Sequence, residues 1–169
     1  VQEAIGLIRN FGEQGKALAQ ELALACKDRA VAIYSSDAAD SVAIRLRQQI
    51  NENSKQLCWH HSLPEMNHNE LVGWDHPRFL TAASTVLLLR TGFDHPRVGL
   101  RFGINRQIIE KHSSRILEVP ARGQSKLAQM LYLLHLADWL SLYLAEANGV
   151  DPAPVKVIDF LKSSLEAQK

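Results

Sequence analysis

Short apolar runs alternate with amphipathic segments through most of the chain. The runs at residues 30–34 (AVAIY) and 84–89 (STVLLL) are almost continuously apolar. Such runs are typical of strands that are buried on both faces of a parallel sheet. The weaker runs at residues 56–59 and 115–119 are predicted to be two further strands.

Apolar side chains at helical spacing predict helices between and beyond these strands. Gly12 and Gly15 interrupt the first helix, because each glycine costs about 1 kcal/mol relative to alanine. That helix is expected either to bend there or to begin after Gly15. The predicted helices span residues 1–28, 38–50, 105–112, 125–148 and 155–165, and residues 90–97 are predicted to be a turn-rich link.

The order of these elements predicts the fold class. Strands that alternate with helices, followed by two helices at the end, are typical of an α/β fold with a mostly parallel sheet. We expect a three-layer α/β/α sandwich of the flavodoxin-like kind, with long C-terminal helices. A length of 169 residues and an apolar content of 46% suit a single domain with a full hydrophobic core.

Composition narrows the possible partners and the compartment. The formal net charge is +1, so no excess of positive charge points to nucleic acid or to a membrane surface. No apolar run approaches the roughly 20 residues that cross a bilayer. Cys26 and Cys58 match no zinc spacing and form no disulfide framework, so they are expected to be free thiols in a reducing cytoplasm.

The groups best suited to chemistry are concentrated in residues 51–70 (NENSKQLCWHHSLPEMNHNE). Glu52 follows the apolar face of a predicted helix and is either a general base or a solvated glutamate at a helix end. His68 lies in a polar loop and is either an acid–base group or a surface residue. A metal site that uses His60, His61, His68 and Glu65 is the less favoured interpretation, because adjacent histidines rarely ligate one metal together.

Other candidates are weaker. Ser35 and Ser36 follow a predicted strand and precede a predicted helix, so their hydroxyls and backbone N–H groups are suited to a phosphate. The motif lacks a glycine that would let the backbone approach closely. Lys156 and Lys162 lie on the last predicted helix, where lysines are most often solvated. Neither GxGxxG nor a P-loop occurs in the sequence.

Three segments together resemble a known family. They are RLRQQINENSK, LPEMNHNELVGW, and the long C-terminal run that ends in NGVDPAPVKVIDFLKSSL. These motifs resemble, in the same order, the C-terminal half of the bacterial and archaeal bifunctional phosphoglucose/phosphomannose isomerases. Those enzymes belong to the sugar-isomerase (SIS) superfamily, so the resemblance implies a SIS-like fold from about residue 30 to residue 165.

The resemblance also implies roles for particular residues. Glu52 matches the base that moves a proton between C1 and C2 of a hexose 6-phosphate through a cis-enediol, and His68 matches the histidine that helps to open the sugar ring. Lys162 matches a lysine placed near the ring oxygen, with Lys156 as the alternative. The reaction requires no metal and no redox cofactor. The family acts in glycolysis and gluconeogenesis as homodimers with shared active sites, so His68 is expected to serve the partner subunit.

The departures from the family shape the domain prediction. The family has an N-terminal SIS domain with a phosphate-binding Ser/Thr loop, and nothing in this chain matches that domain. We therefore expect residues 1–29 to be a helix or linker from an upstream domain, and residues 30–169 to be the C-terminal isomerase domain. Ser35, Ser36 and Asn51 are the predicted substrate-binding residues. The alternative function is a non-catalytic module for sugar-phosphate binding or dimerisation.

Overall fold

Four parallel strands form the centre of the protein in a computed structural model that describes residues 1–113 and 115–168. The strand order in the sheet is β2-β1-β3-β4, so β1 and β3 occupy the middle. Val31 of β1 lies opposite Cys58 on one side and Thr85 on the other, which fixes the register. The strands are β1 (Ala30–Ser36), β2 (Cys58–Leu63), β3 (Ser84–Arg90) and β4 (Arg115–Pro120).

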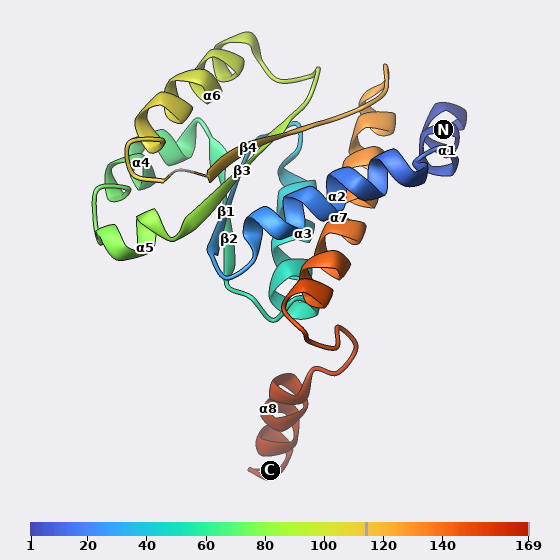
Figure 1. Ribbon diagram of the computed structural model, residues 1–169, viewed down its shortest axis with the longest axis vertical. Helices are drawn as coiled ribbons and strands as arrows, with labels where there is room; N and C mark the ends of the chain where they lie inside the picture. Colours follow the sequence, from blue (N-terminus) through green and yellow to red (C-terminus); the bar gives the residue numbers. More distant parts are fainter. Residues whose placement is uncertain (114, 169) are drawn as a thin grey trace.

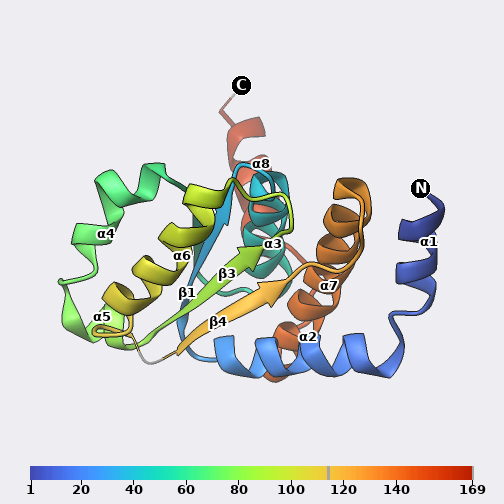
Figure 2. The ribbon, with the colours of Figure 1, turned by 90° about the horizontal axis from the view of Figure 1, so that it is seen from above.

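Helices cover both faces of this sheet, as Figure 2 shows from above. One face carries α2 (Gly12–Cys26), α3 (Asp40–Asn53) and α7 (Lys126–Ala147). Helices α2 and α3 both pack against α7, as does α1 (Gln2–Arg9). The other face carries η1 (Glu65–His68), α4 (Glu70–Gly73), α5 (Arg78–Ala82) and α6 (Pro96–Ile109). The last helix, α8 (Lys156–Glu166), projects away from both layers (Figure 1).

Each face of the sheet has its own hydrophobic core. Between the sheet and α2, α3 and α7, buried aliphatic side chains such as Leu22, Ile33 and Leu140 form the larger cluster. On the opposite face, Tyr34 and Phe102 belong to a smaller cluster with the helices of that layer. The three-layer α/β/α sandwich predicted from the sequence is therefore confirmed, with an entirely parallel sheet among the described residues.

Most predicted elements are confirmed, and two were placed wrongly. The second strand is residues 58–63 rather than 56–59, because the Gln56 amide donates to the Cys26 and Arg29 carbonyls in the turn before it. Helix α6 begins at Pro96 rather than at residue 105, with the His95 side chain accepting from the Arg97 N–H. Its apolar residues face both inward and outward, so no clear stripe marked it.

The predicted first helix is two helices. The chain turns between α1 and α2 at Gly12, whose φ of +49° is a conformation that a glycine adopts without strain. Gly15 is needed for a different reason, because a Cβ there would lie 2.6 Å from the Phe11 ring. Within the described residues, no helix has both the length and the apolar character that a membrane span requires.

Candidate functional site

Glu52 lies on the rim of a cavity at the amino edge of the sheet. It occupies the last turn of α3, a helix that runs back from the carboxyl edge of β1 to the start of β2. The cavity has a volume of about 690 Å³ and lies between this turn and the beginning of α8. Its lining includes Glu52, Lys55, Leu57, Val155, Lys156 and Ile158.

The residues beside Glu52 are fixed in place, whereas its own carboxylate is not. The Asn53 amide donates to Ser141 Oγ at 3.0 Å, and the Ser54 hydroxyl donates to the Ser141 carbonyl at 2.8 Å. Lys55 Nζ donates to the Glu52 backbone carbonyl at 2.6 Å and to the Pro152 carbonyl at 3.2 Å. Within the described residues the exposed Glu52 carboxylate has no hydrogen bond or ion pair, so it is available to a ligand.

His68 lies at the opposite, carboxyl edge of the sheet. It ends η1, the short helix that follows β2, and its side chain is exposed. Met66 of the same helix is completely buried and anchors it to the smaller core. The imidazole itself makes no hydrogen bond within the described residues, so it faces outward from a fixed helix.

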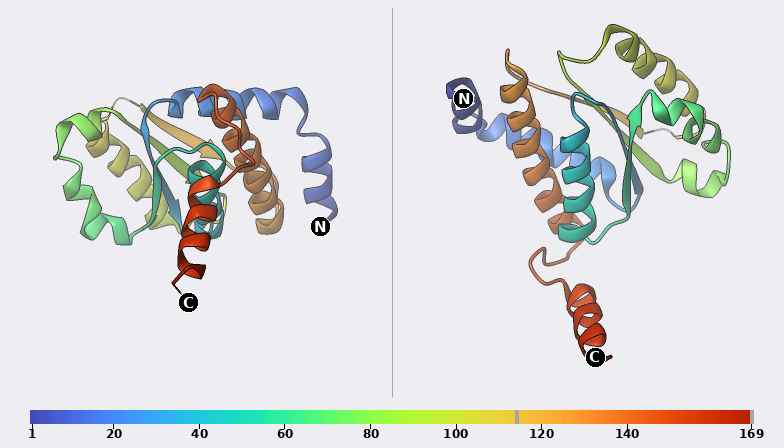
Figure 3. Two further views of the ribbon diagram at one scale, coloured as in Figure 1. Left: turned by 90° about the horizontal axis from the view of Figure 1, so that it is seen from below. Right: turned by 180° about the vertical axis from the view of Figure 1, so that it is seen from behind.

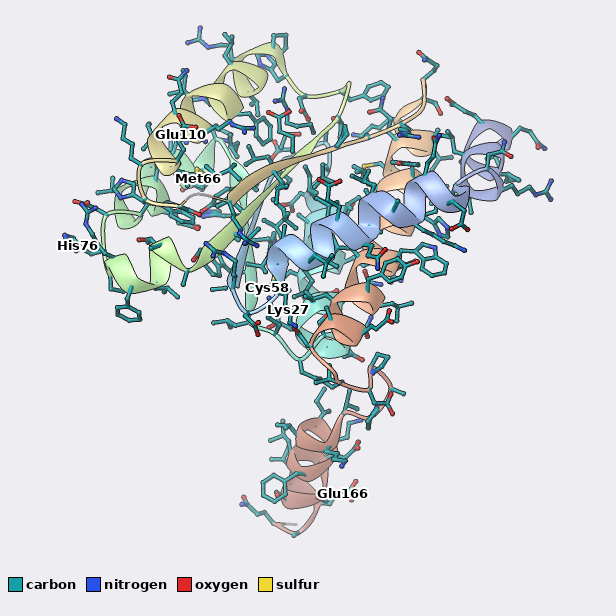
Figure 4. All side chains as sticks on the ribbon, viewed as in Figure 1. Lys27, Cys58, Met66, His76, Glu110 and Glu166 are labelled. Atoms are coloured by element: carbon teal, nitrogen blue, oxygen red, sulfur yellow. The ribbon has the colours of Figure 1, made fainter. Side chains whose placement is uncertain are left out.

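The length of β2 separates these two groups. Figure 4 labels Cys58 at the start of the strand and Met66 in the helix beyond its end. Six residues of strand span about 20 Å. Because a hexose phosphate is shorter than this, Glu52 and His68 of one chain cannot both contact its reacting carbons.

The two candidate lysines are also separated by the structure. Lys156, at the start of α8, lines the same cavity as Glu52, whereas Lys162 lies further along this exposed helix and does not line it. The views in Figure 3 show α8 extending away from the body of the protein. Its apolar side chains are exposed to solvent, namely Val157, Ile158, Phe160, Leu161 and Leu165.

Of the three predicted substrate-binding residues, Ser36 and Asn51 make hydrogen bonds within the protein and Ser35 does not. Ser36 Oγ donates to Asp94 Oδ1 at 2.5 Å and accepts from the Ala38 N–H. Ser35 Oγ is buried and has no partner among the described residues. Asn51 donates to the Arg47 and Cys58 carbonyls and accepts from the Cys58 N–H, so its amide joins the end of α3 to β2.

Histidines of β2 point in alternate directions and have different partners. His61 Nδ1 lies 2.8 Å from Glu70 Oε2, on the face of the sheet that α4 covers. His60 points to the α3 side, where its Nε2 lies 3.9 Å from Asp40. Burial and then the nearby Arg47 lower the pKa of His60. Among the described residues, no three His, Cys, Asp or Glu side chains form a group that could hold a metal ion.

The comparisons with known proteins identify the family to which this α/β/α sandwich belongs. Residues 15–165 match the family described as the bacterial phospho-glucose isomerase C-terminal SIS domain. The chain therefore belongs to this family. The matched region includes α2, which packs into the larger core with α7.

The similar proteins of known name are longer than this chain. It is 43% identical over 134 residues to the bifunctional phosphoglucose/phosphomannose isomerase of Aquifex aeolicus, covering 79% of this chain and 42% of that protein. Identity to the protein of the same name from Caldicellulosiruptor bescii is 36%, covering 89% of this chain and 44% of the relative. The chain thus spans less than half the length of these relatives.

Solved structures show the same fold. A glucose-6-phosphate isomerase like protein from Thermus thermophilus aligns with a TM-score of 0.66 and 25% identity, covering 79% of this chain and 44% of that chain. The C-terminal domain of glucosamine-fructose-6-phosphate aminotransferase from Francisella tularensis aligns with a TM-score of 0.59 and 13% identity, covering 89% of this chain and 42% of that one. The second likeness concerns the fold alone.

Proposed function

We propose that the chain is the C-terminal half of an aldose–ketose isomerase that acts on glucose 6-phosphate and fructose 6-phosphate, and on mannose 6-phosphate as a further substrate. The observation that carries this proposal is the Glu52 carboxylate, exposed and without an internal partner on the rim of a cavity. Relatives that share its family are named for this activity. We further propose that the protein acts in glycolysis and gluconeogenesis in the cytoplasm.

The proposed reaction is a proton transfer within the sugar. With the ring open, Glu52 takes the C2 proton of the aldose while the C2 electrons form the C1–C2 double bond of a cis-enediol, whose O1 takes up a proton. The O2 proton then leaves as the C2 carbonyl forms, and the proton held by Glu52 returns to C1. One carboxylate that both takes and returns a proton is sufficient for this step.

Ring opening is a separate acid–base step, which we assign to His68 with a lysine of α8. A histidine donates and accepts protons near neutral pH, which suits it to this role. Lys156 and Lys162 both remain candidates for this lysine. Lys156 lines the same cavity as Glu52, whereas Lys162 matches the family's lysine in the sequence motif.

The proposed active protein is a homodimer with shared sites and an N-terminal SIS domain that binds the phosphate. The separation of Glu52 from His68 supports sharing, since a sugar bound at Glu52 requires His68 from a second chain. The apolar side chains of α8 are exposed, and the start of this helix lines the Glu52 cavity. This supports the proposal that a further domain or subunit packs there. On this proposal the 169-residue chain alone is inactive or very poor.

Glu52→Gln tests the assignment in the full-length polypeptide that contains this chain. Removal of the base should lower turnover of fructose 6-phosphate about 1,000-fold, while the dissociation constant of the sugar phosphate changes less than about twofold. Glu21→Gln, which alters an exposed glutamate of α2, is the matched control. Full turnover in Glu52→Gln contradicts the proposal. Binding of the sugar phosphate to the wild-type polypeptide without any turnover indicates the non-catalytic module instead.

A further inference from the structure

Glu70 is the centre of a hydrogen-bond network that no step above uses. It begins α4, two residues after His68, and its side chain is 24% exposed. Glu70 Oε1 accepts from Tyr34 Oη at 2.5 Å and from Trp59 Nε1 at 2.7 Å. Its other oxygen, Oε2, lies 2.8 Å from His61 Nδ1. One carboxylate is thus bound by side chains of both β1 and β2.

The donors around Glu70 are themselves held in place. Tyr34 is completely buried and accepts from Trp74 Nε1 at 2.8 Å, and Trp74 immediately follows α4. Burial and then the Glu70 charge raise the pKa of Tyr34, so its hydroxyl remains a donor. Both ends of α4 are therefore fixed to the sheet, one through Glu70 and the other through Trp74.

A second anchor holds the other side of His68. Asn67 donates to Asn105 Oδ1 of α6 at 2.7 Å and accepts from Arg101 at 3.1 Å. Asn105 is buried. His68 therefore lies between one anchor to α6 at Asn67 and one to the sheet at Glu70, while its own ring is exposed. Loops move more than the elements that they connect, so such anchors decide where an exposed ring is held.

We propose that Glu70 is a positioning residue for ring opening, because it fixes the segment that presents His68 to the site of a second chain. This inference rests on the proposed function. A proton-transfer group must be held within about 0.5 Å of its productive position, and a displacement of about 1 Å can lower the rate about 100-fold. Glu70 supplies this precision without contacting the sugar.

The inference predicts that two kinds of substrate respond differently to the loss of Glu70. Fructose 6-phosphate must be opened before proton transfer, so its turnover depends on His68 and Glu70 as well as on Glu52. A tetrose 4-phosphate carries its phosphate on the hydroxyl that would close a ring, so this aldose is always open. Exchange of its C2 proton with deuterated water requires Glu52 but not ring opening.

The decisive variant is Glu70→Gln in the full-length polypeptide. It keeps the size of the side chain but offers one acceptor oxygen where three donors converge. We expect kcat for fructose 6-phosphate to fall about 10- to 100-fold with KM within about twofold. Proton exchange in the tetrose 4-phosphate should remain within about twofold of wild type. His68→Asn should show the same separation, and Glu65→Gln, an exposed glutamate of η1 with no hydrogen bond within the described residues, should change neither rate.

The other outcomes identify which claim fails. If Glu70→Gln matches Glu65→Gln, or lowers both rates equally, the positioning role is wrong while the proposed function stands. If Glu52→Gln retains proton exchange, the proposed function is wrong. Should Glu70→Gln fail to fold, Asn67→Ala removes the anchor on α6 instead and must show the same selective loss of fructose 6-phosphate turnover. Equal loss of both rates in a folded Asn67→Ala protein overturns the inference.

Discussion

The two edges of the sheet use polar side chains in opposite ways. At the carboxyl edge, between β1 and β3, Asp94 accepts hydrogen bonds from Ser36, from the Thr91 hydroxyl and from the Thr91 N–H. Its side chain is only 4% exposed. At the amino edge, Glu52 is exposed on the rim of an open cavity, and none of the hydrogen bonds of its described neighbours involves its carboxylate.

This contrast bears on where the domain would bind a phosphate. In open α/β sheets, ligands usually bind at the carboxyl edge, where the strand order reverses. In this sheet that point lies between β1 and β3, and the Asp94 carboxylate occupies it. A negative group in that position disfavours phosphate. This agrees with the proposals that the phosphate site lies in another domain and that the reaction takes place at the amino edge.

Replacement of Asp94 should have the largest effect on stability. Asp94→Ala leaves the Ser36 and Thr91 hydroxyls without their shared acceptor and leaves Arg90, 3.6 Å away, without its closest carboxylate. We expect the free energy of unfolding to fall by about 3 kcal/mol. Denaturant unfolding measures this, with Asp37→Ala, which alters the exposed aspartate next to Ser36, as the control. A change below about 0.5 kcal/mol would show that the hydrogen bonds of Asp94 do not stabilise the carboxyl edge.

The stability of the protein at alkaline pH should test whether water is excluded from the core around Cys26, near the amino edge of the sheet. Cys26 ends α2 and Cys58 begins β2, both buried, and burial raises the pKa of the Cys26 thiol from near 9 to about 12. Because the folded chain keeps this proton above pH 9 while the unfolded chain loses it, stability is lost as pH rises from about 9 towards 12. Between about pH 8 and about pH 10 the loss should be about 1.4 kcal/mol for this thiol.

The measurement compares wild type with Cys26→Ala at both pH values. The alanine variant lacks the titrating thiol, so its free energy of unfolding should fall less over this interval by the stated amount. Parallel pH dependence of the two proteins would mean that water reaches Cys26 in the folded state. Rapid labelling of Cys26 by a thiol reagent in the native protein would lead to the same conclusion.

Replacement by alanine should change the free energy of unfolding differently at Ser35 and at Ser36, which are adjacent at the end of β1. Ser36→Ala removes the donor to Asp94 and the acceptor for the Ala38 N–H, so it should cost about 1 kcal/mol. Ser35→Ala removes a buried hydroxyl that has no partner among the described residues, so it should be neutral or stabilising. Equal losses at both positions in denaturant unfolding would contradict this assignment of partners. A raised KM in Ser35→Ala would support the predicted role of Ser35 in substrate binding.

The sequence predicted the layers better than it predicted the surroundings of the site. The runs that became β1 and β3 were recognisable because strands buried on both faces need nearly continuous apolar side chains. Glu52 and His68 could be proposed as site residues because their neighbours form recognisable motifs. Asp94 was missed because Ser36, 58 residues away in the sequence, meets it only when β1 and β3 pair. The partners of Glu70 likewise come from two different strands.

The smallest effect should come from the residue that matters most for the proposed chemistry. Glu52→Gln removes a carboxylate that has no partner within the described residues, so the free energy of unfolding should change by less than about 0.5 kcal/mol. Asn53→Ala, one residue further along α3, should cost about 1 kcal/mol because it removes the hydrogen bond to Ser141. Denaturant unfolding compares the two. A Glu52→Gln protein that unfolds as easily as Asn53→Ala would show that the carboxylate supports the fold, and its loss of turnover could then no longer be assigned to proton transfer.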